Sequence, residues 1–171
     1  VIGGGASGIQ CALVLHQLGV RVLLVSRGVG SPRNGPDLNA PALQFHEKNI
    51  RDLASLSVEM LDANVEVVEW TPELNYRIQT DQGVLFSRFV ILATGDGSVS
   101  DMDFVSTLNL DKDSSGKIIV DERYGTSNIR LYAVGDVVSE VKNGLSSALG
   151  TGFAAARQVY DRIQVDRLMP V

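Results

Sequence analysis

The sequence predicts an α/β fold with a central parallel sheet, and three features of the chain carry this prediction. The runs Arg21–Val25 and Phe89–Ala93 are almost continuously apolar, which is typical of strands that a parallel sheet buries on both faces. Between Val1-Ile2, which end a first strand, and the earlier run lies a segment with helical spacing of apolar residues, Ile9–Leu18. Strand, helix and strand in this order form a βαβ unit, whose two strands are parallel. Because Val1-Ile2 is short for a strand, we expect further residues upstream of it.

The middle of the chain adds a helix and a small antiparallel β-meander. Apolar residues at helical spacing predict a helix over Ala42–Leu61. A short strand follows at Val65–Val68, and two further strands, Tyr76–Thr80 and Val84–Phe86, flank the turn residues Asp81-Gln82-Gly83. Strands joined by so short a turn are expected to pair antiparallel.

The last third of the chain returns to the central sheet. Ile129–Val134 is a further apolar strand, and Leu145–Ile163 is a helix rich in small residues. The stretch Asp96–Gly116 is mostly polar, which predicts a solvated surface. Neither an internal repeat nor a linker divides the chain, so residues 1–171 are expected to form one domain.

Composition restricts the classes of function. The chain has 171 residues, 44% of them hydrophobic, and a formal net charge of -5, which argues against nucleic acid or an anionic membrane surface as the main partner. It contains no apolar run long enough to span a bilayer. The single cysteine, Cys11, has no second thiol to pair with in these residues and favours a reducing, cytoplasmic location.

A glycine-rich turn joins the first strand to the first helix. Gly3, Gly5 and Gly8 have the G-x-G-x-x-G spacing: the first glycine permits a tight turn, the second lets backbone N–H groups approach a pyrophosphate, and the third lets helix pack on strand. The helix N-terminus adds partial positive charge toward the phosphates. In this context the motif predicts a Rossmann-like FAD/NAD(P)-binding domain, and a vestigial turn without a nucleotide is the alternative.

The end of the second strand departs from the usual dinucleotide pattern. An acidic residue commonly stands there and bonds the adenosine ribose, but this chain has Ser26 and Arg27. A serine hydroxyl also bonds a ribose hydroxyl, whereas an arginine suits the 2′-phosphate of NADP. On these residues alone FAD, NADP and a solvent-exposed arginine without a ligand all remain open.

Three further segments resemble the flavin- and pyridine-nucleotide-dependent disulfide reductases, in particular thioredoxin reductases. Val90–Gly95 resembles the strand and turn that pass close to the dinucleotide in that superfamily, and Thr126–Val137 resembles its second FAD signature. Gly144–Ala156 resembles the family's last helix, whose N-terminus points at the flavin pyrimidine ring and stabilises negative charge on it. The resemblance covers nearly the whole chain, in the family's order.

The resemblance implies FAD as the cofactor and a set of residues that hold it. Asp136 stands where the family's aspartate accepts a hydrogen bond from a ribityl hydroxyl of the flavin, and a helix cap is the alternative interpretation of this residue. The other candidates lie at the glycine turn, at the strand ends and at the start of the last helix. The full set of candidate cofactor-binding residues is Gly3, Gly5, Ala6, Ser7, Gly8, Ser26, Arg27, Val68, Ala93, Thr94, Gly95, Gly135, Asp136 and Leu145.

The chain also departs from the thioredoxin reductase pattern. In that family an NADPH domain and a Cys-x-x-Cys lie between the Ala-Thr-Gly strand and the Gly-Asp strand, yet Gly95 and Gly135 are only 40 positions apart and no Cys-x-x-Cys occurs. We therefore expect an FAD-dependent oxidoreductase, monomer or homodimer, that relies on an unidentified electron donor or acceptor protein. The alternatives are a non-catalytic flavin or nucleotide sensor or scaffold, and an NADP-binding protein.

Other reactive residue types give weaker candidates, and no catalytic residue is assigned. Cys11 is expected in the core and His16 near a helix C-terminus. Trp70 is interpreted as a rim aromatic or as a ring that stacks on adenine, and His46 as an exposed helix residue or a proton donor. The loop candidates for bonding flavin heteroatoms are Asn34, Asp37 and Asn39. Two histidines and one cysteine without ligand spacing predict no metal site.

Overall fold

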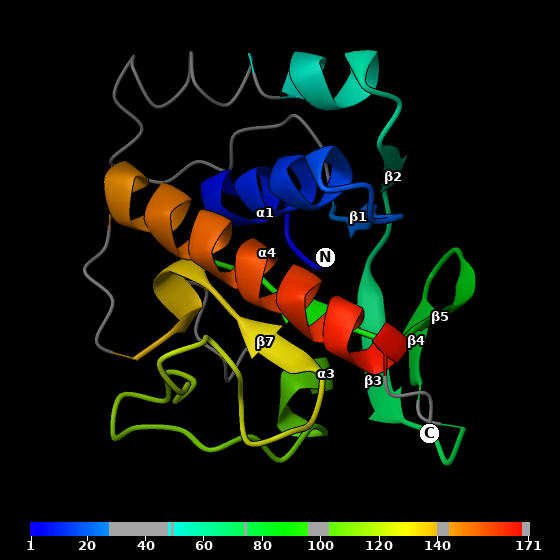
Figure 1. The fold of residues 1–171 in the computed structure, drawn as a ribbon. Coiled ribbons are helices and arrows are strands. Elements are labelled where there is room, and N and C mark those ends of the chain that lie inside the picture. The colour runs from blue at the N-terminus through cyan, green and yellow to red at the C-terminus, as the bar shows by residue number, and fades with distance from the viewer. Residues whose placement is uncertain (28–47, 49, 74, 96–102, 140–143, 169–171) are drawn as a thin grey trace.

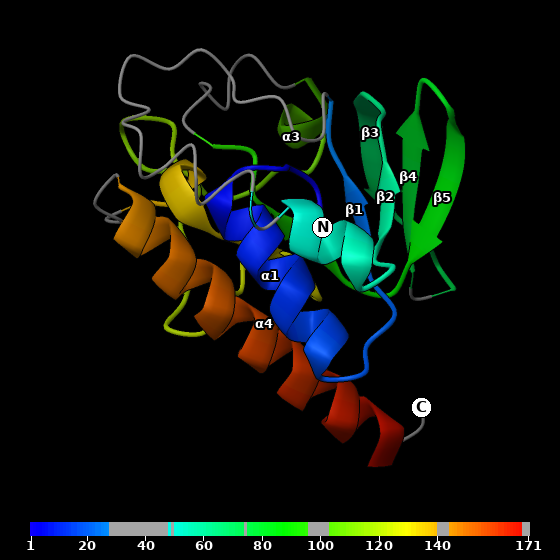
Figure 2. The same ribbon diagram turned by 90° about the horizontal axis from the view of Figure 1, so that it is seen from above.

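The computed structural model stacks its elements in three layers (Figure 1, Figure 2). Two helices, α1 (Ala6–Gln17) and α4 (Leu145–Leu168), lie side by side on one face of a parallel sheet. An antiparallel sheet and the short helix α3 (Asp103–Ser106) cover the other face. The residues that the structure describes are 1–27, 48, 50–73, 75–95, 103–139 and 144–168.

The middle layer is a parallel sheet with the N-terminal residues at its centre. Its named strands are β1 (Leu23–Val25), β2 (Glu59–Leu61), β6 (Val90–Leu92) and β7 (Leu131–Ala133). β1 pairs with β2 and β6 pairs with β7, both in parallel. Ile2 joins the two pairs, because it bridges Val25 on one side and Leu92 on the other. The order β2–β1–Ile2–β6–β7 confirms the predicted central parallel sheet.

Alternate residues of these strands face the two outer layers. Leu24 and Ile91 lie in one core cluster, which also contains Ile9 of α1 and Ala155 of α4. Val25 and its neighbours in the second cluster pack instead against the antiparallel sheet and α3. Both faces are therefore buried, which is the physical reason for the unbroken apolar runs in the sequence.

The antiparallel layer confirms the predicted meander. Its strands are β3 (Val65–Trp70), β4 (Tyr76–Thr80) and β5 (Gly83–Ser87), hydrogen-bonded in that order. The Tyr76 hydroxyl donates to the Ile129 carbonyl at 2.8 Å, which ties this layer to the loop before β7. Burial raises the pKa of Tyr76 to about 12. Trp70 packs edge-on against Tyr76, with ring centroids 5.0 Å apart.

The predicted helix over Ala42–Leu61 is wrong at its C-terminal end. Residues 50–55 are helical, but Ser57 adopts a left-handed backbone with φ 58, and Glu59–Leu61 form β2. The Val58 N–H donates to the Leu53 carbonyl, which closes the helix end. Met60 fits the apolar spacing of a helix and also the inner side of an edge strand, so periodicity alone did not separate the two. Residues 42–47 lie outside the described part of the chain.

The expectation of a solvated surface over Asp96–Gly116 holds only in part for the described residues 103–116, where Asn109 and Lys112 are exposed but several apolar residues are not. Phe104 and Val105 of α3 are buried, and so are Leu108 and Leu110 after it. They belong to the core cluster beneath the parallel sheet. The average polarity of the stretch concealed a few apolar residues that share one face.

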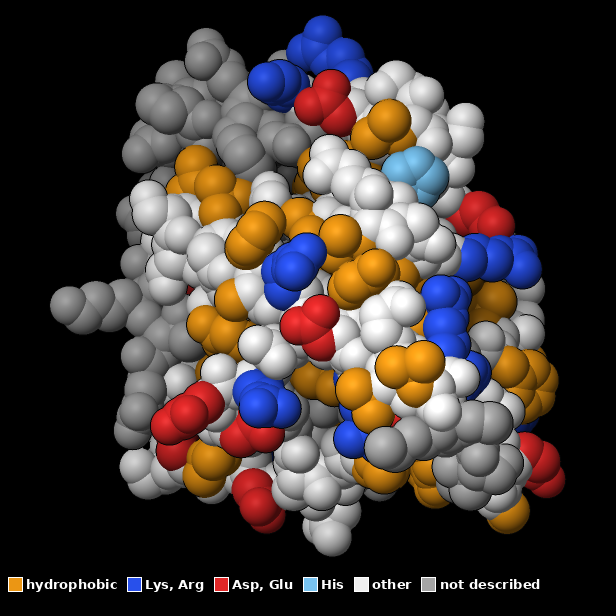
Figure 3. All heavy atoms as spheres, viewed as in Figure 1, with side chains coloured by type: hydrophobic (Ala, Val, Ile, Leu, Met, Phe, Trp, Pro, Cys, Tyr) orange, Lys and Arg blue, Asp and Glu red, His pale blue; other side chains and the backbone are white. Residues whose placement is uncertain are grey.

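The helical layer follows the sequence prediction closely. α1 starts at Ala6 and is followed by Gly19 at φ +76, whose N–H donates to the His16 carbonyl. α4 runs to Leu168, five residues beyond the predicted end. Figure 3 shows apolar side chains interspersed with charged ones over the face that carries these helices. Among the helices of the described residues, none is both long and apolar enough to cross a bilayer.

The C-terminal part of α4 is tied to the edge of the sheet at which the strands begin, called here the amino edge. Arg130, which precedes β7, pairs with Asp166 of α4 at 2.8 Å, and the two side chains are only 8% and 7% exposed. Asp166 also pairs with Arg162 at 3.0 Å and with Arg88, which precedes β6, at 3.5 Å. The Arg130 guanidinium lies 5.6 Å from the centre of the Phe89 ring.

Candidate functional site

Most of the predicted site residues meet at the opposite edge of the sheet, where the parallel strands end. This carboxyl edge is where open α/β sheets bind their ligands. Gly3 follows the first strand and Ser26 follows β1, and the Ser26 N–H donates to the Leu61 carbonyl at the end of β2. Ala93 follows β6, and Gly135 lies two residues after β7.

The glycine turn is held by close backbone contacts that leave room for hydrogen only. Gly3 has φ +114, and a Cβ built on it would overlap the Ala93 carbonyl. A Cβ on Gly8 would overlap the Gly3 carbonyl in the same way. A Cβ on Gly5, in contrast, would meet no atom within 4 Å. The turn therefore packs tightly against the sheet on one side and opens at Gly5 on the other.

The N-terminus of α1 begins at this opening. Gly5 is its N-cap, and no side chain caps the helix. The first intrahelical hydrogen bond runs from the Ile9 N–H to the Gly5 carbonyl at 2.9 Å. The N–H groups of residues 6–8, which include Ala6 and Ser7, precede that ladder and lie at the positive end of the helix dipole. Together they form a backbone site suited to an anion.

The Ala-Thr-Gly segment after β6 forms the adjoining wall. Ala93 is 2% exposed and packs against the glycine turn. The Thr94 hydroxyl oxygen is buried, and no hydrogen-bond partner for it occurs among the described residues. Gly95 has φ +80 and open space where a Cβ would stand. Because a buried hydroxyl normally has a partner, Thr94 marks a polar position that a ligand would satisfy.

The Gly135-Asp136 turn lies against both α1 and α4. Gly135 has φ +75, and a Cβ on it would stand 2.5 Å from the Ser7 hydroxyl oxygen. A Cβ on Gly152 of α4 would overlap the Ser7 carbonyl. Asp136 is half buried and lies in a single 3-10 turn, η2 (Gly135–Val137). Ser7 is therefore enclosed between the Gly-Asp turn and α4.

Ser26 and Arg27 lie beside the glycine turn, at the end of β1. A Cβ on Gly4 would stand 2.8 Å from the Ser26 hydroxyl oxygen, so the two segments are in contact. That hydroxyl lies 3.4 Å from the Arg27 carbonyl, to which it donates. The Arg27 side chain is exposed. Both residues are placed at the corner of the sheet where an adenosine ribose lies in dinucleotide folds.

Two of the predicted cofactor-binding residues, Val68 and Leu145, do not lie at the ends of the parallel strands. Val68 lies in the middle of β3, paired with Ile78, and its side chain is buried in the core at 1% exposure rather than at the carboxyl edge. Leu145 is the first residue of α4 and is half buried. The loop candidates Asn34, Asp37 and Asn39, and also His46, lie outside the described residues.

Sequence reasoning missed a hydroxyl that connects two parts of this edge. Thr151 of α4 is 6% exposed, and its Oγ1 accepts a hydrogen bond from the Gly135 N–H at 3.2 Å. The same hydroxyl donates to the Ala148 carbonyl at 3.1 Å. A polar β-branched residue inside a run of small residues was the available signal, but its partner is 16 positions away.

A second cluster orders the loop that packs beside η2. The Asp113 carboxylate accepts hydrogen bonds from the hydroxyls of Ser115 and Ser139, each at 2.7 Å. These bonds hold the pKa of Asp113 well below its usual range. Ser139 follows directly after the residues that close η2, so the cluster anchors the chain that leaves the Gly-Asp turn.

The other reactive residues do not lie at this edge. Cys11 is completely buried among α1, α4 and the sheet, and burial raises the pKa of its thiol to about 12. His16 lies half exposed in the last turn of α1, as predicted. Within the described residues, no group of three or more histidine, cysteine or acidic side chains is placed to hold a metal ion.

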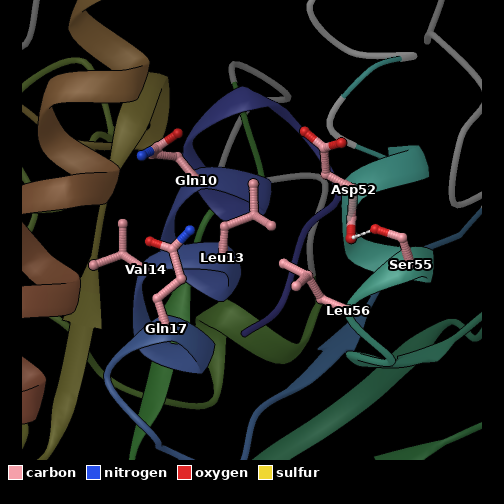
Figure 4. A pocket seen from close by; sticks show the side chains of 7 residues that line it. All are labelled: Gln10, Leu13, Val14, Gln17, Asp52, Ser55 and Leu56. Atoms are coloured by element: carbon pink, nitrogen blue, oxygen red, sulfur yellow. Dashed lines mark hydrogen bonds between the residues drawn. The ribbon is translucent and has the colours of Figure 1, made fainter.

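A hollow of about 380 Å³ lies on a different side of α1 (Figure 4). Residues of α1 line one side of it, among them Leu13 and Gln17, and Asp52, Ser55 and Leu56 line the other side. It is lined by the later turns of α1 and by the segment 52–56, and by none of the candidate cofactor-binding residues. Its position away from the helix N-terminus and the strand ends separates it from the carboxyl-edge site.

Comparison with known proteins agrees with this geometry. The chain is 22% identical over 161 residues to a mercuric reductase from Bacillus cereus, a match that covers 93% of this chain and 25% of the relative. It is 23% identical over 147 residues to a dihydrolipoyl dehydrogenase from Mycoplasma genitalium, covering 82% of this chain and 29% of that protein. The chain thus spans between a quarter and a third of the length of these curated relatives.

Solved structures share the fold at low identity. A thioredoxin reductase from Streptococcus pyogenes superposes with a TM-score of 0.79 at 16% identity, over 96% of this chain and 97% of the other. An atypical thioredoxin reductase from Desulfovibrio vulgaris Hildenborough gives a TM-score of 0.81 at 14% identity, over 99% and 98% of the two chains. The model of one family, described as pyridine nucleotide-disulphide oxidoreductase, matches residues 1–158. With most of its length covered by that match, the chain belongs to the pyridine nucleotide-disulphide oxidoreductase family.

Proposed function

We propose that the carboxyl edge of this chain binds FAD and that the chain acts as a thioredoxin reductase-like oxidoreductase with an external electron partner. The observation that carries the proposal is the contrast within the glycine turn. Gly3 and Gly8 are closed by backbone contacts, whereas the space over Gly5, at the uncapped start of α1, is open. A helix N-terminus with open space over a glycine suits a pyrophosphate that approaches the backbone closely.

The residues around this opening fit the remaining parts of a flavin dinucleotide. The N–H groups of residues 6–8 would hold the pyrophosphate, and Ser26 would bond the adenosine ribose. The buried Thr94 hydroxyl offers a polar contact on the adjoining wall. Asp136 would accept a hydrogen bond from a ribityl hydroxyl. The start of α4, at Leu145, would direct partial positive charge toward the ring and stabilise negative charge there.

FAD, when bound, supplies the one- and two-electron chemistry that protein side chains lack. The side chains of this chain bind and orient the dinucleotide rather than relay electrons. Its single cysteine is buried, and with its pKa raised to about 12 the thiol stays protonated at neutral pH. A redox dithiol would therefore have to come from outside these residues, as would the electron donor.

The first test is the visible spectrum of protein purified without added cofactor. Absorption bands near roughly 370 and 450 nm, with FAD identified in the supernatant after heat release, are expected for a flavoprotein. A colourless protein that also takes up no added FAD would contradict the proposal. Photoreduction of the loaded protein then separates an electron carrier from a sensor: reoxidation by oxygen or by an added acceptor supports the carrier, and a flavin that passes on no electrons supports the sensor or scaffold.

NADP is the second candidate ligand, and the placement of Ser26 and Arg27 favours it. The exposed Arg27 lies at the ribose corner, where its guanidinium would pair with a 2′-phosphate. The purified protein can be titrated with NADPH, and with NADH as the control that lacks the 2′-phosphate. Tight binding of NADPH in preparations free of flavin would support NADP and contradict FAD.

A further inference from the structure

Three serine and threonine residues in the described part of the chain are almost fully buried, Ser7, Thr80 and Thr151. Thr151 is the one that connects α4 to the Gly-Asp turn. Its hydroxyl accepts from the Gly135 N–H at 3.2 Å and donates to the Ala148 carbonyl one helical turn earlier. Both roles of the hydroxyl, acceptor and donor, are therefore used inside the protein.

The Gly135 N–H is the point at which the chain leaves the sheet. The Val134 N–H still donates to Leu92 of the neighbouring strand, at 2.9 Å, so the sheet ladder extends to that residue. At Gly135 the backbone turns into the left-handed region, and its N–H points to Thr151 instead. The Gly135 carbonyl accepts from the Val138 N–H at 3.1 Å. Thr151 thus fixes the entry of the turn, and the 3-10 hydrogen bond fixes its exit.

The position of the turn determines where Asp136 stands relative to α1. Gly135 lies against the Ser7 hydroxyl and Gly152 lies against the Ser7 carbonyl, so α1, the turn and α4 are in contact over backbone atoms. Such contacts keep the segments from moving closer, but they do not hold the turn against moving outward. The hydrogen bond that the Gly135 N–H of the turn donates to Thr151 of α4 supplies that restraint.

We propose that Thr151 is a positioning residue for the flavin site: its hydroxyl holds the Gly135-Asp136 turn against α1 and α4, at the spacing that bound FAD requires. This inference rests on the proposed function, because it concerns the same site. A Thr151→Val change keeps the shape of the side chain and leaves the buried Gly135 N–H without its acceptor. Thr151→Ser keeps the hydroxyl and removes only the methyl group.

The test measures FAD affinity and the stability of the apoprotein in four proteins. Thr151→Val is expected to weaken FAD binding about tenfold, the equivalent of one lost hydrogen bond at a buried site. Thr151→Ser is expected to bind within about threefold of the unchanged protein. The matched control is Thr80→Val, since Thr80 is equally buried and its hydroxyl also accepts one backbone N–H and donates to one carbonyl, in the β4–β5 hairpin. Thr80→Val should lower stability and leave FAD affinity unchanged.

Amide hydrogen exchange gives a readout that needs no flavin. In the apoprotein of Thr151→Val, the Gly135 amide is expected to exchange faster while the amides of β6 and β7 keep their protection. Equal FAD affinity of Thr151→Val and the unchanged protein would overturn the inference, and so would a Thr151→Val chain that fails to fold, since the hydrogen bond would then serve the fold as a whole. If the unchanged protein itself binds no FAD, the proposed function fails and the inference fails with it. This outcome is distinct from failure of the inference alone, in which the unchanged protein binds FAD and Thr151→Val binds it equally well.

Discussion

The two edges of the parallel sheet are held together by different kinds of contact. At the carboxyl edge, backbone touches backbone through glycines, and the side-chain contribution is a neutral hydroxyl, Thr151. At the amino edge, long charged side chains surround the nearly buried carboxylate of Asp166. α4 runs from one edge to the other and is fixed at both (Figure 1).

This difference suggests that the carboxyl edge serves ligand binding and that the amino edge serves stability. Glycine contacts keep side chains away from the carboxyl edge and leave backbone N–H groups available to a ligand. The ion cluster instead fills the part of the amino edge before β6 and β7 with charged side chains. Substitutions at the amino edge should therefore affect unfolding, and substitutions at the carboxyl edge should affect FAD binding.

The largest expected effect is at the amino edge. Asp166→Ala breaks the 2.8 Å ion pair with the nearly buried Arg130 guanidinium, and breaking a buried ion pair costs about 3–5 kcal/mol. We expect a loss of this size in the free energy of unfolding, measured by urea denaturation, with FAD affinity unchanged. Asp161→Ala is the control, because Asp161 is exposed on the same helix and should change stability by less than about 0.5 kcal/mol. Equal losses in the two variants would show that burial of the Asp166 pair is unimportant.

The second effect is at the carboxyl edge, where we expect a substitution to lower FAD affinity and leave stability unchanged. A Cβ at Gly5 points into open space, so Gly5→Ala should leave the apoprotein as stable as before. The same methyl group would occupy the space over the helix N-terminus and weaken FAD binding at least about tenfold, measured by fluorescence titration. Gly3→Ala makes the contrast, because overlap with the Ala93 carbonyl at φ +114 should cost stability as well. Undiminished FAD binding by Gly5→Ala would place the pyrophosphate elsewhere.

A third prediction concerns the packed layer between the edges. Burial raises the pKa of the Cys11 thiol from its ordinary value of 9.0 to about 12 in the folded protein. Stability from the protonated thiol is therefore complete below pH 9 and declines by about 1.4 kcal/mol per pH unit between pH 9 and pH 12. Denaturation curves at pH 8, 9 and 10 should show the decline, and Cys11→Ala should remove it. Rapid alkylation of Cys11 in the folded protein would contradict the burial on which this prediction depends.

The smallest effect is expected at the corner of the carboxyl edge. Ser26→Glu introduces the acidic residue that dinucleotide folds commonly use to bond the ribose, and should strengthen FAD binding by about threefold to tenfold. The same change should weaken any NADPH binding, because it places a negative charge near the 2′-phosphate. Ser26→Ala provides the comparison for loss of the hydroxyl alone. An unchanged FAD affinity in both variants would mean that the ribose lies away from this residue.

Local patterns in the sequence predicted most of the fold. The runs around Leu24 and Ile91 are apolar because both faces of the sheet are covered. The spacing of Gly3 and Gly8 was recognisable because the turn packs so closely that neither position has room for a Cβ. The strand at Glu59–Leu61 was missed because its few apolar residues also fit a helix. Contacts between distant side chains left no local pattern: Thr151 meets Gly135, and Asp166 meets Arg130, only after the sheet and α4 have come together.

The strand at the centre of the sheet also sets an order of events during protein synthesis. Ile2 pairs with Val25 on one side and with Leu92 on the other, so its second partner is made 90 residues later. At typical elongation rates this delay lasts about 5–20 seconds. During that interval the glycine turn has no Ala93 carbonyl to pack against and no α4 to enclose Ser7. The proposed dinucleotide site is thus among the last parts of the chain to assemble, and we expect FAD to bind only after the central sheet has formed.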